Sequence, residues 1–338
     1  ITERDWSSDV CSSDLASNGA LDLSLDGKFN QKPFDAAVQL GGEEDRETYR
    51  YSGYLPMSVL ALGVSDIKPY VSGAATVDAK WQDDSINLTA DLREMEYRVP
   101  ALKLSKAAGA TARLEAKGKV RGDIVSLSSA SYSDGRAAFS GAASFNQQSG
   151  ALLSSRIDNL SFGKTRMKGS YALKSGKHEV NLTGSMLDLE PLLAKPEPDK
   201  KEEPGKTFLQ RLIDIPDMSA NVTFDTIRFA EDRQLQDTRL LAECQNGRCS
   251  KFELDTRTGE TGLTARIGAT GDKRNFTMST PDLGRFLRVT GMFDDMRDGV
   301  LNISAVYQDE LPNAPMAGRA VLENFSVRNV PLLAKLLT

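Results

Sequence analysis

The sequence is poor in the residues that most often carry chemistry: 338 residues hold one histidine, His178, and three cysteines. A Ser-His-Asp triad would have to use His178, which lies in "SGKHEVNL", a pattern typical of a turn that runs into a strand. A titrating surface histidine is the simpler interpretation. A zinc site at Cys244 and Cys249 would need two more Cys or His ligands. The chain offers only His178 and Cys11, and Cys11 lies in an N-terminal segment that is set aside below. We therefore expect no catalytic residues, no metal and no cofactor, and a protein that is not an enzyme.

Motifs for nucleotides, nucleic acids and membrane spans are also missing. "GKT" occurs at Gly163 and Gly205, but five residues earlier stand Asp158 and Lys200 where a phosphate-binding loop needs glycine. No GxGxxG follows a predicted strand. The net charge is −5, without a basic patch interleaved with aromatics, which argues against nucleic acid as a partner. No run reaches the roughly 18 apolar residues that a membrane-spanning helix needs.

What the sequence does contain is a two-residue alternation of apolar and polar side chains along most of its length. Such alternation predicts strands with one apolar and one polar face. Turn signals such as Asn18-Gly19 and Asp298-Gly299 recur near every ten residues, which favours a meander of antiparallel strands. The apolar positions form our candidate set for a functional face: Leu21, Leu23, Leu25, Ile86, Leu88, Leu92, Val180, Leu182, Val222, Phe224, Phe252, Leu254, Leu263, Ile267, Phe276, Met278, Leu301, Ile303, Val321 and Phe325.

Short Leu-rich segments with helical spacing interrupt the strands. They are predicted at residues 54–63, 188–195, 207–216, 281–291 and 329–337. Before the fourth of them, Thr280 is a predicted N-cap and Pro281 a predicted first helical residue.

The charged, Pro-rich stretch 194–206 predicts a linker between two β-rich segments, residues 16–193 and 207–338. Residues 1–15, "ITERDWSSDVCSSDL", resemble a translated adapter and are set aside as non-native. The chain stops within an apolar helical pattern, and we interpret it as a truncated internal segment of a longer protein.

The stretch "CQNGRC" predicts a tight hairpin. Asn246-Gly247 suits a type I′ turn, because both central residues of that turn have positive φ. Gln245 would then pair with Arg248, and Cys244 would face Cys249 at a distance that a disulfide can span. Two reduced cysteines on adjacent strands are the alternative. A disulfide would indicate an oxidising compartment.

Four stretches carry a family resemblance. "MAGRAVLENFSVRNVPLLAKLL" resembles the C-terminal region of AsmA-like proteins: a Gly-containing strand, an aromatic near its end, then a Pro-Leu-Leu helix. "STPDLGRFLRVTGMFDDMRDGVLNISAVY" is similar to the element before it, and "NLTGSMLDLEPLL" also matches. "TADLREMEYRVPALKLSKAAGATARLEAKG" departs from the pattern by lacking the usual aromatic before its lysine. The resemblance covers roughly residues 20–338.

The resemblance implies a fold and a function. AsmA/TamB-like proteins of Gram-negative bacteria are held in the inner membrane by an N-terminal helix and extend through the periplasm. Their long curved antiparallel sheet with short interspersed amphipathic helices, a repeating β-groove, is thought to carry phospholipid between inner and outer membranes. The candidate apolar residues would then line the groove, and outer-membrane or other envelope proteins would be possible partners.

Two alternatives stay open from the sequence alone. The same alternation would serve a closed β core, in which the apolar faces pack on each other. A sheet edge could also pair with client strands, as in a non-enzymatic scaffold or assembly factor for outer-membrane proteins or envelope structure.

Overall fold

The computed structural model confirms a mostly β protein, with 74% of the described residues in strands and 6% in helices. It describes residues 6–15, 21–29, 31–40, 47–57, 70–193, 216–270, 273–311 and 314–328. The chain forms two compact units, unit 1 (residues 1–163) and unit 2 (residues 164–338), and each is described by itself. The predicted linker 194–206 lies outside the described residues.

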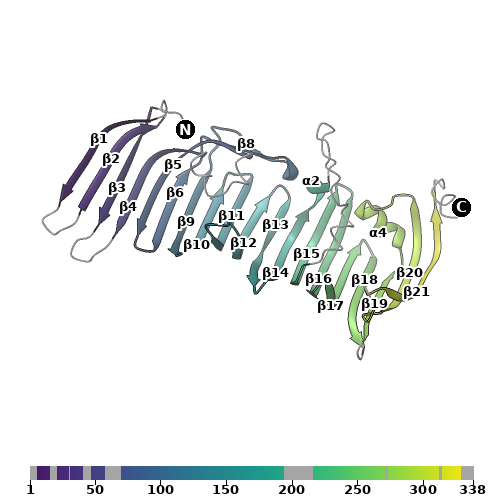
Figure 1. Cartoon of the computed structure of the whole chain (residues 1–338). Helices are drawn as coiled ribbons and strands as arrows, with labels where there is room; N and C mark the ends of the chain where they lie inside the picture. Colours follow the sequence, from purple (N-terminus) through teal and green to yellow (C-terminus); the bar gives the residue numbers. More distant parts are fainter. Residues whose placement is uncertain are drawn as a thin grey trace. The chain divides into compact units, whose positions relative to one another are not determined.

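Unit 1 is an antiparallel sheet in which most strands pair with their sequence neighbours (Figure 1). Its strands are β1 (Trp6–Leu15), β2 (Leu21–Phe29), β3 (Lys32–Leu40), β4 (Thr48–Pro56), β5 (Val71–Gln82), β6 (Ser85–Asp91), β7 (Met95–Val99), β8 (Leu104–Lys106), β9 (Arg113–Arg121), β10 (Ile124–Ser133), β11 (Ala137–Asn146) and β12 (Leu152–Phe162). A 3-10 helix, η4 (Pro100–Leu102), joins β7 to β8. The segment set aside as non-native lies here as β1, paired with β2.

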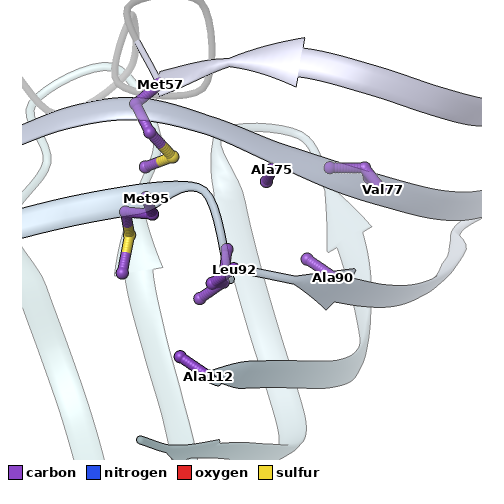
Figure 2. Close-up of a cluster of buried hydrophobic side chains, with 7 residues drawn as sticks. All are labelled: Met57, Ala75, Val77, Ala90, Leu92, Met95 and Ala112. Atoms are coloured by element: carbon purple, nitrogen blue, oxygen red, sulfur yellow. The ribbon is translucent and has the colours of Figure 1, made fainter. Parts of the chain in front are cut away.

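At one strand end of the unit 1 sheet, the chain after β6 folds over the apolar face. Strand β5 pairs with β6 along most of its length and with β7 at its start, so that β7 and β8 continue the sheet beyond a break at residues 92–94. Figure 2 shows the buried cluster that results: Met57, Ala75, Val77, Ala90, Leu92, Met95 and Ala112. We call β7, η4 and β8 together the cover.

A carboxylate and a buried lysine hold the cover in place. Asp134, at the β10–β11 turn, accepts hydrogen bonds from the hydroxyls of Tyr97 in the cover and Tyr132 in the sheet. Lys106 is 3% exposed, and its Nζ donates to the carbonyl oxygen of Met95 at 2.6 Å and of Arg93 at 3.2 Å. Burial lowers the pKa of Lys106, and these carbonyls replace the water that its ammonium group loses.

Unit 2 contains the strands β13 (Thr165–Lys174), β14 (Lys177–Asp188), β15 (Met218–Ala230), β16 (Arg233–Gln245), β17 (Arg248–Thr258), β18 (Thr261–Thr270), β19 (Lys273–Thr280), β20 (Met296–Tyr307) and β21 (Met316–Val327). All neighbours pair antiparallel except β14 and β15, which are parallel. The prediction of an entirely antiparallel sheet is therefore wrong at this pair. Residues 189–217 connect the two strands, and a parallel pair requires a crossover connection of this length.

Among the described residues of unit 2 lie the helices α2 (Glu190–Leu193) and α4 (Leu283–Thr290), which fall within the predicted helical segments 188–195 and 281–291. Asp282 caps α4 by accepting a hydrogen bond from the Arg285 backbone N–H at 2.8 Å, so the prediction of Thr280 as N-cap is wrong. The Asp282 side chain is close enough to the free N–H groups of the first turn to satisfy one of them. The predicted helix 54–63 begins instead as the end of β4, and 207–216 and 329–337 lie almost entirely outside the described residues.

Glycines inside the strands mark places where neighbouring strands come unusually close. A Cβ on Gly118, Gly141, Gly184 or Gly318 would lie 2.0–2.3 Å from a carbonyl oxygen of the neighbouring strand. Register shifts accompany the first three, because a bulge places one strand unusually close to the next. All four glycines pair with residues of the apolar face. The close approach between neighbouring strands therefore lies on that face.

Candidate functional site

The pairing register of unit 1 aligns apolar side chains across successive strands, because directly opposed residues point to the same face. One row runs through Leu23, Val38, Tyr49, Trp81, Ile86, Gly118, Leu127 and Ala143. The next runs through Leu25, Ala36, Tyr51, Ala79, Leu88, Ala116, Ala130, Gly141 and Ile157. These rows extend the apolar face from β2 to β11 and β12.

The opposite face of the same strands is polar. One of its rows runs through Asp26, Asp35, Ser52, Asp78, Thr89, Glu115 and Ser131. Salt bridges lie among the exposed charged residues, for example from Asp84 to Lys119 at 3.2 Å and to Arg121 at 3.0 Å. The two-face pattern predicted from the alternation is therefore present in the fold.

The apolar face of unit 1 is covered only in part by the described residues. Under the cover, Val77 and Ala90 are 3% and 4% exposed. Towards the other strand end, Tyr49 and Trp81 are 39% and 38% exposed, and Ile86 is half-buried. Large side chains that a second layer covered would be far less accessible. The described part of the chain therefore leaves a strip of this face open.

Unit 2 has the same design. One row runs through Val180, Ala220, Ala242, Phe252, Ile267, Phe276, Ala305 and Gly318, and the next through Leu182, Val222, Leu240, Leu254, Ala265, Met278, Ile303 and Ala320. Helix α4 covers one strand end of this face, where Phe286 and Val289 pack on Leu235 and Leu263. Away from the helix, Ile267, Phe276 and Ile303 are half-buried.

The structure places the predicted face residues in three groups. Most are half-buried on the apolar faces: Leu21, Leu23, Leu25, Ile86, Leu88, Val180, Leu182, Val222, Phe252, Leu254, Ile267, Phe276, Met278 and Ile303. A second group is buried in local packing: Leu92, Phe224, Leu263 and Leu301. The remaining two, Val321 and Phe325, lie in β21.

Val321 is a correction to the predicted face. It pairs with Asn302 on the polar side, while its neighbour Leu322 pairs with Leu301 on the apolar side. Two adjacent apolar residues leave the phase of a strand ambiguous, which is why the sequence assigned the wrong one. Phe325 follows Asn324, whose φ is +55°, and is 48% exposed.

Aromatic residues of β4 and β5 were missing from the predicted face. Tyr49, Tyr51 and Trp81 all lie in the apolar rows, and the Tyr49 and Trp81 ring centroids are 6.3 Å apart. The alternation in "TYRYSGYL" carried the signal, but tyrosine fits either face of a sheet because its hydroxyl is polar.

The predicted hairpin at Asn246-Gly247 is confirmed. Both central residues have positive φ, +52° and +72°, and Gln245 pairs with Arg248. The Cys244 and Cys249 sulfurs are 2.05 Å apart, the length of a disulfide bond. The bond lies on the apolar face, packed with Ala220, Ala242 and their half-buried neighbours.

Neither unit offers a metal centre or a membrane-spanning helix within its described residues. No group of three or more His, Cys, Asp or Glu is placed to hold a metal ion there. The helices of the described segments are too short and too polar to cross a bilayer. Comparisons with protein-family models, with curated proteins and with solved structures found no match to this chain.

Proposed function

We propose that this chain carries the acyl chains of phospholipids along its apolar faces, as the periplasmic part of an AsmA-like protein that connects inner and outer membranes. The observation that carries the proposal is the partly open apolar strip of each unit, backed by a polar face. A closed β core would bury these positions, and the exposure of Tyr49 and Trp81 argues against it for the described residues.

The energetics of such a site need no specific contacts. Each CH₂ group removed from water contributes about 0.8 kcal/mol, whichever apolar side chain it touches. Half-buried side chains such as Ile86 and Phe276 would lose their remaining contact with water when an acyl chain covers them. A ligand held this way can slide from row to row, because neighbouring rows offer similar contacts.

The compartment and the anchor are part of the same proposal. The Cys244–Cys249 disulfide supports an oxidising compartment such as the periplasm. An inner-membrane anchor would have to come from sequence outside this segment.

Substitutions of adjacent residues, one on the apolar and one on the polar face of the same strand, test the proposal in each unit. Ile86→Asp and Phe276→Asp place a charge on the apolar face of unit 1 and unit 2, and Asn87→Asp and Thr277→Asp place the same charge on the polar face. Each protein is exported to the periplasm, purified, and its bound lipids are quantified by mass spectrometry. We expect the apolar-face variants to lose most of the lipid and the polar-face variants to keep it, with far-UV circular dichroism unchanged in all four.

Equal lipid loading in all variants would refute the assignment of the binding face. A wild-type chain that is folded but free of lipid would refute lipid carriage, and would favour a scaffold that pairs with client strands at a sheet edge.

A further inference from the structure

Two arginines share one aspartate at the strand end of unit 2 that lies away from α4. Arg274 Nε donates to Asp309 Oδ2 at 2.9 Å, and Arg248 Nη1 lies 3.7 Å from Asp309 Oδ1. The hydrogen bond from Arg274 lowers the pKa of Asp309, which is therefore ionised at neutral pH. Two cations and one anion leave this cluster with one positive charge.

The cluster lies directly beyond the apolar rows. Phe276 is in the row that contains Ile267 and Ala305, and Arg274, two residues before it on β19, points to the same face. The Arg274 guanidinium carbon is 4.1 Å from the centroid of the Tyr307 ring, and Nη1 donates to the Cys249 carbonyl oxygen at 2.7 Å. A strip of apolar side chains thus ends at a cationic group that aromatic and backbone contacts hold in place.

At the other strand end, helix α4 covers the apolar face through Phe286 and Val289. Gly284 fits α4 so closely against β20 that a Cβ would lie 2.8 Å from the Met296 carbonyl oxygen. A polar headgroup attached to a chain on this face would therefore have to emerge at the end that carries Arg248 and Arg274.

We propose that Arg248 and Arg274 bind the anionic, phosphate-bearing headgroup of a lipid whose acyl chains lie on the apolar face of unit 2. The inference rests on the lipid-carrying function proposed above and adds a preference for net anionic lipids over zwitterionic ones. Guanidinium groups bind phosphate oxygens through paired N–H donors. The phosphate would compete with Asp309 for these donors. The neighbouring exposed residues Lys273 and Glu310 have opposite charges. Asp217 adds a carboxylate at the same turn, where it accepts a hydrogen bond from the Asn246 N–H at 2.6 Å.

The test uses the full chain with its disulfide intact and vesicles that contain equal amounts of phosphatidylglycerol and phosphatidylcholine with identical acyl chains. After incubation and separation, mass spectrometry gives the ratio of the two lipids on the protein. We expect the wild type to favour phosphatidylglycerol. The double variant Arg248→Gln/Arg274→Gln should lower the ratio by about tenfold, the effect of one lost charge-assisted contact. Asp309→Asn, which removes the competing carboxylate, should raise it.

Two further variants separate binding from folding. Arg248 is exposed, so Arg248→Gln alone should lower the ratio without disturbing the contacts of Arg274. Arg319→Gln removes an exposed arginine from the polar face, where Arg319 pairs with Ser304, and should leave the ratio unchanged.

Each result has one meaning. Lipid binding with the same ratio in wild type, Arg248→Gln and Asp309→Asn would overturn the headgroup site and leave lipid carriage standing. Loss of both lipids from the wild type would count against the proposed function itself. Inorganic phosphate is titrated calorimetrically into the lipid-free chain. Phosphate binding that depends on Arg248, together with an unchanged lipid ratio in Arg248→Gln, would show a site for free phosphate and overturn its assignment to a lipid.

Discussion

Removal of the Asp188 carboxylate should destabilise unit 2 strongly. Asp188 and Arg228 pair across the parallel strands β14 and β15, with Arg228 Nη1 3.1 Å from Asp188 Oδ2. Their side chains are 9% and 8% exposed. Arg228 Nη2 also lies 2.6 Å from Glu190 Oε2, at the first residue of α2. The Asp188–Arg228 pair therefore joins the end of β14, where the crossover connection begins, to β15, the strand that follows the connection.

The expected loss in the free energy of unfolding follows from the burial of the Asp188–Arg228 pair. Loss of one partner leaves a buried charge without its counterion, which costs about 3–5 kcal/mol, whereas replacement of both partners by apolar residues is often close to neutral. Glu190 keeps part of the compensation in Asp188→Ala, so we expect the lower end of that range. A unit of this size loses about 2–4 °C of Tm per kcal/mol, which gives a decrease of about 10 °C. The double variant Asp188→Leu/Arg228→Met should recover most of it.

The two units can be followed separately in one sample. Both tryptophans, Trp6 and Trp81, belong to unit 1, whereas circular dichroism reports the strands of both units. Asp188→Ala should lower the temperature of one circular dichroism transition and leave the tryptophan fluorescence transition in place. If Asp188→Ala changed neither, or if the double variant were less stable than the single one, the pair would not be stabilising the crossover as argued.

Two further perturbations have defined directions. Reduction of Cys244–Cys249, or Cys244→Ser/Cys249→Ser, should destabilise unit 2 by about 2 kcal/mol, the chain-entropy value for a closed loop of about six residues. Thermal circular dichroism with and without reductant measures this loss, and an unchanged double-serine variant under reductant is the control. Burial raises the pKa of Asp134, but hydrogen bonds from Tyr97, two backbone N–H groups and Tyr132 outweigh it and lower the pKa overall. Because the folded-state pKa is the lower one, this stabilisation is complete above about pH 4 and is lost as the pH falls further. Tryptophan fluorescence during acid titration should show less acid sensitivity in Asp134→Asn, and an identical titration curve would contradict the role of Asp134 in holding the cover.

Local chemistry explains what the sequence could predict. The Asn246-Gly247 turn and the phase of strands such as β6 depend on neighbouring residues, and both agree with the structure. Long-range pairing is different. Nothing near Asp188 or Arg228 in the sequence indicates that β14 and β15 run parallel, because that choice depends on how a 29-residue connection packs. The correct phase of β21 likewise depends on the pairing of Leu322 with Leu301 of the preceding strand.

The distinction between a groove and a core also lies beyond the alternation, because both require the same pattern. What separates them is the exposure of large side chains on the apolar face, such as Tyr49 and Trp81 at 39% and 38%. Glycines in the apolar rows add no such distinction. Gly118, Gly141 and Gly184 interrupt apolar rows at positions where any side chain would collide with the next strand, and a register shift accompanies each. At these positions a bulge raises the local twist, and glycine allows the close approach of the two strands, in a groove and in a closed core alike.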